Sequence, residues 1–427
     1  MTINSPQLLS KMSARRRDFH AYPETGWAEF RTTAKIAEII DSLGFNIKFG
    51  GNFILPETVM GLTTDPKKEM ERAVKQGANP KWVEKTGGYT GLSAEIDTGR
   101  PGPTLALRFD IDCVDVVEAD DEDHLPAREG FRSHNHGCMH ACGHDGHTTI
   151  GLSVAEFVAE NKDSLTGKIR LLFQPAEEGV RGGYAMTQSG LLDDVDYFIA
   201  LHLGLGLPTG TVSGGTKGFL CTTKFDAEFT GKGAHAGGEP NEGKNALLAA
   251  ASAALNLHAI APHRDGPTRV NVGVLTAGEG RNVVPPSAYM KIETRGLTEE
   301  ILKYVYDRSV QVITGAAAMY DCKVQIFKRG ESISTYSDPE IVKIICDAAR
   351  QTEGVNCVKE IMQMTGSDDA CWMMKRVQDH GGKATYVGLG ATIAAGHHNS
   401  RFDFDEACMP IGYGVLTRAI TAILGKK

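Results

Sequence analysis

The sequence lacks the features of a membrane or nucleic-acid-binding protein. No apolar run of about 18 residues occurs among its 427 residues, so no membrane span is expected. The N-terminal stretch MTINSPQLLSKMSARRRDF has no apolar core before its basic residues, which predicts no secretory signal. Positive charge is not in excess, since 45 Lys and Arg stand against 53 Asp and Glu for a net charge of −8. This balance argues against a dedicated nucleic-acid binder, which would carry a basic stripe.

A disulfide framework is also missing. The nine cysteines are an odd number and run from Cys113 to Cys408 without a regular spacing, which favours a reduced, cytoplasmic compartment. The chain is 41% hydrophobic and 23% charged, which is ordinary for globular proteins and excludes a disordered or fibrous chain. Its length exceeds one ordinary core and predicts two or three domains.

Strands and helices alternate along most of the chain. Helices are expected at 6–20 and 29–45, and the polar stretch 56–90 predicts a surface excursion with one short helix. Apolar strands are expected further on, with helices between them, at 91–97, 104–112, 168–173, 197–203 and 383–389. Near-continuous apolar strands of this kind predict an α/β fold with a mostly parallel mixed sheet covered on both faces.

The middle of the chain has a different order of elements. From Thr222 onward the pattern predicts β-α-β-β-α-β, the split-βαβ or ferredoxin-like arrangement, within residues 214–330. We therefore expect a catalytic domain made of 1–213 and 331–427, with 214–330 inserted as a lid or dimerisation domain. Such insertions are tolerated where the ends of the inserted domain lie close together.

The densest group of reactive side chains lies between His134 and His147, where a Gly-rich loop holds five His, two Cys and one Asp. A structural zinc site would need four closed ligands on paired arms. Here Cys138 and Cys142 are four residues apart and no second arm has matching spacing, which favours a catalytic metal site. A simple helix-capping loop is the remaining alternative.

Metal-binding side chains also follow the predicted strands. Function collects at the carboxyl ends of strands in open α/β sheets, and ionisable groups avoid burial unless they are paired or bound to metal. Four strand ends and the His/Cys loop therefore predict one metal site at the rim of the sheet. The strands lead to Asp110 and Asp112, to Glu177 and Glu178, to His202, and to His397 and His398.

The adjacent carboxylates Glu177 and Glu178 can divide two tasks beside a divalent cation. One carboxylate can bind the metal while the other takes a proton from water and hands it to the leaving nitrogen. On an ordinary polar turn the same pair would be two solvated charges.

Eight motifs in order resemble the dinuclear-metal amidohydrolases of the aminoacylase and glutamate-carboxypeptidase clan. They cover essentially the whole chain and read RRRDFHAYPETGWAEFRTT, LALRFDID, MHACGHDGHTT, FQPAEEG, ALH, GKGAHAG, GRNVVPPSA and GHHNSRFDFDE. The resemblance implies hydrolysis of an N-acyl or N-aroyl amino acid. Its first candidate substrate is p-aminobenzoyl-glutamate, and indole-acetyl-aspartate is an alternative.

The resemblance also implies the metal ligands of the catalytic domain, which would hold two divalent ions of zinc or manganese. These ligands are Cys142, His144, Glu178, His202 and His398, with His397 open as the alternative to His398. Cys142 would bridge the two ions at the place where other clan members have an Asp. Glu177 would be the general base and Asp112 would orient a ligand, while Asp368 and Asp369 match an acidic position around the site.

For the inserted domain the resemblance implies contacts with substrate and with a second protomer. His235 would reach the site of a neighbouring protomer and polarise the scissile carbonyl, and Asn282 and Arg295 would grip the free carboxylate of the substrate. The planar fork of Arg suits bidentate binding of a carboxylate. A homodimer through 214–330 is expected, and a paralogous chain is a further possible partner.

Two other functions stay open from the residues. The chain could be a non-catalytic subunit of a hetero-oligomeric hydrolase, although a carrier has no use for a free base such as Glu177. Alternatively, Cys138 and Cys142 could serve a redox or zinc-storage role.

Overall fold

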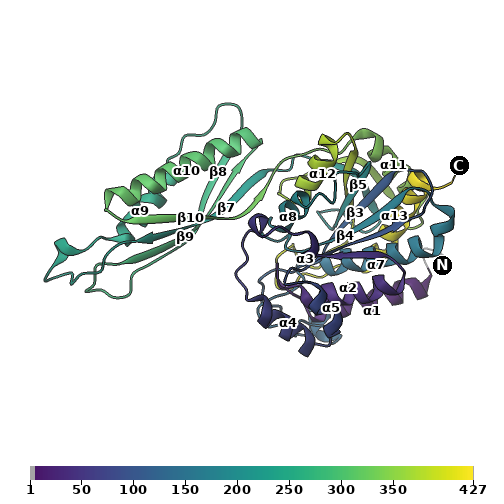
Figure 1. The fold of residues 1–427 in the computed structure, drawn as a ribbon, viewed down its shortest axis with the longest axis horizontal. Coiled ribbons are helices and arrows are strands. Elements are labelled where there is room, and N and C mark those ends of the chain that lie inside the picture. The colour runs from purple at the N-terminus through teal and green to yellow at the C-terminus, as the bar shows by residue number, and fades with distance from the viewer. Residues whose placement is uncertain (1–4, 427) are drawn as a thin grey trace. The chain divides into compact units, whose positions relative to one another are not determined.

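The computed structural model describes residues 5–426 and divides them into two compact units (Figure 1). The first unit runs up to Lys217 and takes up Thr335–Met364 and the chain from Asp369 onward. The second unit consists of Gly218–Ser334 and Thr365–Asp368. Among the described residues, no helix has the length and apolar character needed to cross a membrane.

The first unit is built on an eight-stranded sheet in the order β1-β2-β4-β3-β5-β12-β6-β11. Its strands are β1 (Asn46–Phe49), β2 (Leu92–Asp97), β3 (Thr104–Asp110), β4 (Lys168–Gln174), β5 (Tyr197–Leu203), β6 (Thr211–Lys217), β11 (Cys357–Gln363) and β12 (Lys383–Leu389). Strands β4, β3, β5 and β12 are parallel neighbours, as are β6 and β11. The pairs β1–β2, β2–β4 and β6–β12 are antiparallel. The predicted mostly parallel mixed sheet is therefore confirmed.

Helices cover both faces of this sheet. Phe109 of β3 and Phe173 of β4 pack beneath Gly151 of α7, where an added Cβ would come within 2.7 Å of the Phe109 ring. Arg108 points to the opposite face and pairs with Asp369, at the start of α12. Successive side chains of a strand alternate between faces, so α7 and α12 lie on opposite sides of the sheet.

The helices of the first unit agree with the predicted ones where the prediction named them. The helices expected at 6–20 and 29–45 are α1 and α2, and α2 ends just before Gly44, whose φ is +79°. The α-helices of the unit are α1 (Pro6–Ala21), α2 (Phe30–Ser42), α3 (Gly50–Phe53), α4 (Pro66–Lys75), α5 (Pro80–Lys85), α6 (Leu125–Arg128), α7 (His144–Asn161), α8 (Gly182–Gln188), α11 (Pro339–Arg350), α12 (Ala370–Asp379) and α13 (Cys408–Leu424). Short 3₁₀ turns lie at Pro56–Thr58 and Lys162–Ser164.

The polar stretch 56–90 contains two α-helices where one short helix was expected. Asp65 and Asn79 cap α4 and α5 by accepting the backbone N–H of Lys67 and Lys81, and each helix has Pro at its first position. Pro costs nothing there because its missing N–H would be unpaired in any helix. The buried Trp82 and Val83 anchor the six-residue α5.

The second unit is a four-stranded antiparallel sheet in the order β10-β7-β9-β8, with two helices. Its elements in chain order are β7 (Cys221–Thr230), a 3₁₀ turn (Pro240–Glu242), α9 (Ala246–Leu257), β8 (Thr268–Ala277), β9 (Ser287–Gly296), α10 (Glu299–Met319) and β10 (Lys323–Ser332). This is the predicted β-α-β-β-α-β order. Phe225 and Phe229 of β7 share a buried core with the small residues of α9 and α10.

The compact second unit begins at Gly218, whereas the predicted insertion begins at residue 214. Residues up to Lys217 complete β6, which pairs with β11 in the sheet of the first unit. The role of the unit as a lid or dimerisation domain stays a prediction.

Candidate active site

The carboxyl end of β3 presents two buried carboxylates to the start of α7. Asp110 accepts from His147 Nδ1 at 2.5 Å, and Asp112 Oδ1 lies 3.3 Å from His144 Nδ1. The backbone oxygen of Asp112 lies 2.9 Å from the same His144 nitrogen. These contacts hold both imidazole rings in fixed orientations at the rim of the sheet.

The loop before α7 brings Cys142 and His144 close together. Gly143, at the N-cap, has a φ of +94°, and an added Cβ would come within 2.6 Å of Leu203 Cδ1. Both the left-handed backbone and the close approach require glycine. Cys142 and His144 therefore flank a tight turn, and their side chains lie close together and face β5.

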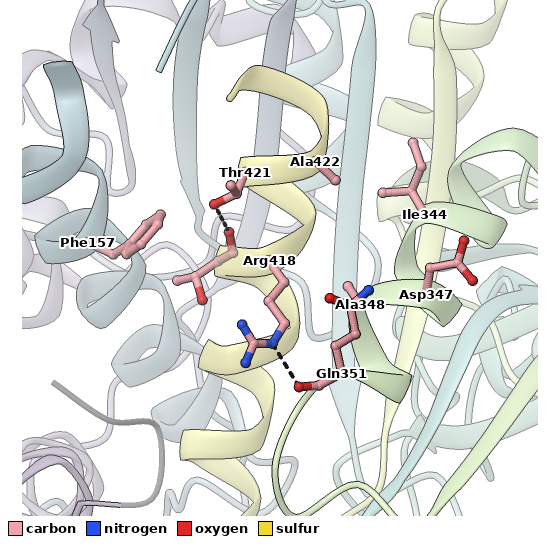
Figure 2. A pocket seen from close by; sticks show the side chains of 9 residues that line it. Phe157, Ile344, Asp347, Ala348, Gln351, Arg418, Thr421 and Ala422 are labelled. Atoms are coloured by element: carbon pink, nitrogen blue, oxygen red, sulfur yellow. Dashed lines mark hydrogen bonds between the residues drawn. The ribbon is translucent and has the colours of Figure 1, made fainter. Parts of the chain in front are cut away.

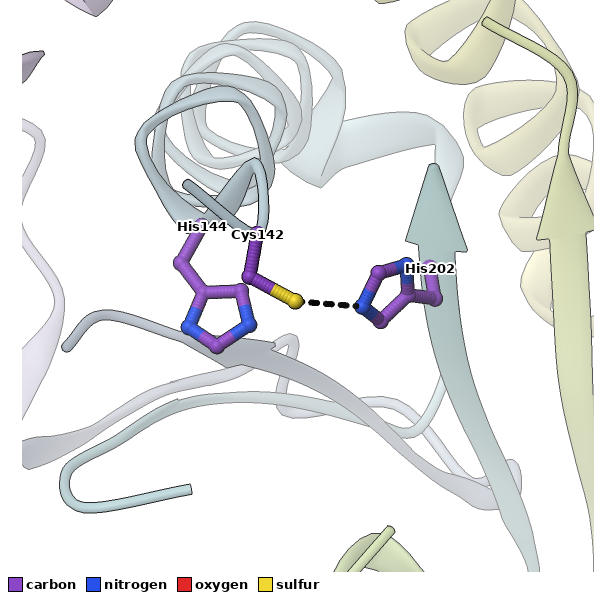
Figure 3. A group of neighbouring side chains, drawn as sticks. All are labelled: Cys142, His144 and His202. Atoms are coloured by element: carbon purple, nitrogen blue, oxygen red, sulfur yellow. Dashed lines mark hydrogen bonds between the residues drawn. The ribbon is translucent and has the colours of Figure 1, made fainter. Parts of the chain in front are cut away.

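His202 of β5 completes this cluster (Figure 3). Its Nε2 lies 3.4 Å from Cys142 Sγ, while its Nδ1 donates to the backbone oxygen of Leu203 at 2.7 Å. The ligand atoms of Cys142, His144 and His202 lie within 4.8 Å of one another. One divalent cation could contact all three.

A second cluster shares Cys142. The ligand atoms of Cys142, Glu178 and His398 also lie within 4.8 Å of one another, and His398 Nε2 is 3.2 Å from Glu178 Oε1. His398 has a φ of +63°, and its backbone N–H donates to the backbone oxygen of Ala141 at 2.8 Å. This bond ties the His398 loop to the loop that carries Cys142.

The turn after β4 carries the two adjacent glutamates. Glu178 N donates to Asp112 Oδ2 at 2.9 Å, so Asp112 joins this turn to His144. Glu177 is largely buried, and its Oε2 lies 3.9 Å from His144 Nε2. Glu177, His144 and Glu178 form a third group, whose ligand atoms lie within 4.8 Å of one another.

The donor set and its surroundings fit a divalent metal. Imidazole, thiolate and carboxylate are the ligands that zinc prefers, and a ligating His usually donates its other ring nitrogen to a backbone or carboxylate oxygen. His144 and His202 do so through Asp112 and Leu203. The buried Nε2 of His144 finds no hydrogen-bond partner among the described residues, as expected of a nitrogen that binds a cation.

Burial and neighbouring charge shift the pKa values of these ligands in opposite directions. Burial, reinforced by Glu178, raises the pKa of the Cys142 thiol well above its usual range. Burial and the neighbouring His147 hold the pKa of His202 well below its usual range, so this imidazole is neutral near pH 7. Burial would lower the pKa of His144, but the negative charge of Asp110 raises it well above its usual range. A cation must therefore displace protons from Cys142 and His144 but not from His202.

Two members of a buried polar network beneath the cluster, Arg108 and Gln174, escaped the sequence analysis. Arg108 donates to Asp110 at 2.7 Å and to Gln174 at 2.6 Å, and Gln174 in turn donates to Asp369 at 2.7 Å. Burial alone would raise the pKa of Asp110, but Arg108 and the nearby imidazoles of His144 and His147 hold it well below its usual range. Arg108 and Gln174 sit inside apolar strand sequences, which gave no signal of this role.

His147 and His397 lie outside the two groups that share Cys142, although His147 forms a further group within 4.8 Å with Asp110 and His144. His147 Nε2 accepts from Leu203 N at 3.0 Å and Nδ1 contacts Asp110, so both of its nitrogens are engaged. His397 lies 5.3 Å from His202, ring centre to ring centre. Burial and the adjacent His398 lower the pKa of His397 to about 4.

The residues predicted for the inserted domain lie in the second unit. His235 is exposed, and its Nδ1 accepts from the backbone of Gly237 and Gly238 at 3.1 and 2.9 Å. The segment that holds Asn282 runs beside it, since Ala236 N donates to the Asn282 oxygen at 3.0 Å. Arg295 of β9 binds both oxygens of Glu293, at 3.0 and 3.1 Å. Glu293 therefore competes with any carboxylate that Arg295 would bind.

A hollow of about 430 Å³ lies elsewhere on the first unit, between α7, α11 and α13 (Figure 2). Its lining includes Phe157, Ile344 and Arg418, and Arg418 donates to the Gln351 oxygen at 3.1 Å. The lining holds no His, Cys or Glu, so it offers no alternative catalytic cluster.

Known proteins resemble this chain over nearly its whole length. The model of peptidase family M20/M25/M40 matches residues 106–422. Indole-3-acetyl-aspartic acid hydrolase of Enterobacter agglomerans is 51% identical over 98% of this chain and 96% of its own length. A subunit of the p-aminobenzoyl-glutamate hydrolase of Escherichia coli is 50% identical over 97% and 96%. The crystal structure of an aminobenzoyl-glutamate utilization protein from Klebsiella pneumoniae has a TM-score of 0.83 at 42% identity and covers 97% of this chain and 96% of that one.

Proposed function

The chain belongs to peptidase family M20/M25/M40, and we propose that it hydrolyses the amide bond between an aromatic acyl group and an acidic amino acid. It is a metal-dependent amidohydrolase, and p-aminobenzoyl-glutamate is the first candidate substrate. The two relatives near 50% identity are named for p-aminobenzoyl-glutamate and indole-3-acetyl-aspartic acid, which share this chemistry. Indole-3-acetyl-aspartate is therefore the alternative substrate.

We propose that the site holds two divalent cations, zinc or manganese, through Cys142, His144, Glu178, His202 and His398. The observation that carries this proposal is that two ligand groups share Cys142 while Glu177 lies alongside. Cys142 would supply a ligand atom to each of the two groups. When bound, the cations would polarise the amide carbonyl and make water more acidic.

The residues of the chain would then handle the protons and the substrate. The Glu177 carboxylate takes a proton from the attacking water and delivers it to the nitrogen of the leaving amino acid. His235 of a neighbouring protomer donates to the carbonyl oxygen, and Asn282 and Arg295 bind the free carboxylate. Asp112 keeps His144 and the backbone of Glu178 in place through the contacts described above.

We further propose a homodimer formed through the second unit and a cytoplasmic location. The partner of the dimer could also be a paralogous chain, since the Escherichia coli relative is named as one subunit of its hydrolase. The nine cysteines are present as thiols, which suits a reducing compartment.

The test is steady-state hydrolysis by the chain purified alone, with the two candidate substrates and with N-acetyl-glutamate as a non-aromatic control. We expect turnover of p-aminobenzoyl-glutamate that a chelator abolishes and that zinc or manganese restores, with metal content measured in parallel. Turnover that survives complete metal removal would contradict the proposal. No turnover of any substrate by the metal-loaded chain would favour a non-catalytic role in a larger hydrolase instead.

A further inference from the structure

The turn that carries the two glutamates has a strained backbone. Ala176 is fully buried and has a φ of +51°, and Val180 has a φ of +58°. Residues other than glycine rarely adopt this left-handed conformation, and it persists only where the surroundings hold it. Something must therefore fix the Pro175–Arg181 turn from outside.

Two buried carboxyl groups hold the backbone on either side of Glu177. Ala176 N donates to Glu29 Oε1 at 2.7 Å, and Glu178 N donates to Asp112 Oδ2 at 2.9 Å. The other oxygen of Glu29 accepts from the Thr90 hydroxyl at 2.6 Å, which fixes the carboxyl group itself. Glu29, Asp112 and Thr90 are all fully buried.

The position of Glu29 in its helix explains why its side chain is available. Glu29 is the N-cap of α2, where a side chain normally accepts a hydrogen bond from the first turn of its own helix. Here Glu24 does this instead, accepting from Arg31 N at 3.0 Å and Thr32 N at 2.7 Å. The carboxyl group of Glu29 is thereby left to reach a different part of the fold.

The segment before α2 also packs directly on the turn. A Cβ at Gly26 would come within 3.0 Å of Ala176 Cα and within 2.2 Å of Arg181 Nη2. Trp27 next to it has a φ of +70° and is buried. Residues 26–29 thus form a close-packed support for residues 176–181.

We propose that Glu29 is a positioning residue for Glu177, holding the Ala176 peptide in the conformation that aims the Glu177 carboxylate. This inference rests on the proposed role of Glu177 as general base. Without the acceptor, the buried Ala176 N–H would lose its partner and the strained peptide could relax. The first side chain to move would be that of Glu177, which is one residue away.

The test compares Glu29→Gln with Glu29→Met in the full-length, metal-loaded chain. Burial and the nearby Asp112 carboxylate raise the pKa of Glu29 to about 8, so the neutral amide of glutamine is a close mimic that keeps the acceptor. Methionine has a similar volume but no acceptor. We expect Glu29→Gln to keep kcat within about threefold, and Glu29→Met to lower kcat by about tenfold to a hundredfold at unchanged KM.

A matched control separates positioning from stability. Glu118→Met removes another buried carboxyl group, which contacts His20 and His124 and touches neither the turn nor the start of α2. We expect it to lower the thermal stability and leave kcat unchanged. If Glu29→Met does not fold, Thr90→Val is the alternative variant, since it removes the hydroxyl group that holds the Glu29 carboxyl group. It should lower kcat severalfold at unchanged KM.

A second measurement does not depend on activity. In metal-free protein, amide hydrogen exchange of a peptide spanning 174–182 should accelerate in Glu29→Met and stay unchanged in Glu29→Gln and Glu118→Met. Equal kcat values for the Gln and Met variants, or an effect on KM alone, would overturn the inference. If Glu177→Gln itself retained full activity, the proposed mechanism would fail; if only the Glu29 variants had no effect, this inference alone would fail.

Discussion

Glu177 stands out among the single residues because it lies outside both groups that share Cys142, whereas its neighbour Glu178 belongs to one of them. Its Oε2 is 3.9 Å from His144 Nε2. Glu177→Gln keeps the shape of the side chain but cannot accept a proton. We expect kcat to fall by about 10²- to 10⁴-fold with bound metal unchanged, as measured by steady-state kinetics and elemental analysis. Glu178→Gln is the matched control and should lower the metal content instead.

Cys142 is the residue on which the two ligand groups depend. Cys142→Ala removes an atom from both groups, so we expect loss of at least one bound ion and a fall in metal affinity of at least about tenfold. Cys142→Asp should restore binding, because a carboxylate can also contact two cations. Elemental analysis after dialysis against a weak chelator measures both. Equal metal contents in the Ala and Asp variants would contradict a bridging role.

Glu118 should make the free energy of unfolding of the first unit depend on pH. It accepts from His20 and His124, each at 2.9 Å. Burial would raise the pKa of Glu118, but these two imidazoles lower it from 4.5 to about 2. A carboxyl group whose pKa is lower in the folded than in the unfolded state stabilises the fold at a pH above its unfolded-state pKa. This stabilisation is lost as the pH falls through its folded-state pKa. The contribution should therefore vanish between about pH 4.5 and pH 2.

The test is urea unfolding as a function of pH for the parent and for Glu118→Gln. The parent should lose on the order of 3 kcal/mol more than the variant across this window. Glu122→Gln removes an exposed carboxylate of the same loop and should leave the pH dependence as it is in the parent. Parallel curves for Glu118→Gln and the parent would show that Glu118 contributes no such stability.

The sequence pointed to most of the residues that the first unit brings together, because ligands at strand ends and in Gly-rich loops leave a visible pattern. Cys142, His202 and Glu178 are examples, since each follows or ends an apolar strand or opens a helix. Glu29 left no such signal. Its part depends on a hydrogen bond to Ala176, almost 150 residues away, and a single carboxylate at a helix start looks like an ordinary cap.

At the scale of elements, the start of α7 depends on Gly143. Gly143→Ala places a Cβ at a φ of +94° and within 2.6 Å of Leu203, so backbone strain and a clash act together. Gly44 ends α2 with a φ of +79° but has no atom within 4 Å of an added Cβ. Gly44→Ala therefore tests the strain alone and should cost about 1 kcal/mol, while Gly143→Ala should cost about 2–4 kcal/mol.

The urea midpoint at neutral pH measures both variants. Only Gly143→Ala should also weaken metal binding, because Cys142 and His144 flank the altered residue. Equal destabilisation by the two substitutions would mean that the Leu203 side chain yields without cost and that strain alone explains the requirement for glycine.

The elements that the sequence analysis missed share a physical cause. Strand β6 reads TVSGGTK and β11 reads CVKEIMQ, so neither has a continuous apolar run. Strand β11 lies at the edge of the sheet and pairs only with β6, and an edge strand needs less apolar sequence than a central one. Strand β6 is buried between β12 and β11, and its two glycines pack closely against α11. The central strands β3, β4, β5 and β12 are buried on both faces and were predicted for that reason.

At the scale of the whole molecule, the chain has two hydrophobic cores that are packed with side chains of different size. The first unit fills the space between a mixed sheet and helices on both faces with large apolar side chains. The second unit packs two helices on an antiparallel sheet and uses small residues, including Ala246, Ala249, Ala250 and Ala253 of α9. The Ala-rich face of α9 is therefore core, so it is not available for a second copy.

We propose that a dimer covers the edge strand β8 and the outer face of α9, which both carry exposed apolar side chains. Val274 and Leu275 of β8 are 38% and 40% exposed, and Leu255 of α9 is 77% exposed. Edge strands with exposed apolar residues favour pairing with another chain.

Leu255→Lys combined with Leu275→Lys should turn a dimer into a monomer, as measured by sedimentation velocity. It should also lower kcat if His235 serves a neighbouring site. Met319→Lys, on α10 and 69% exposed, is the matched control and should leave the mass unchanged. A dimer that persists in the double variant would place the interface elsewhere, and a parent that sediments as a monomer would remove the expected role of His235 in a neighbouring protomer.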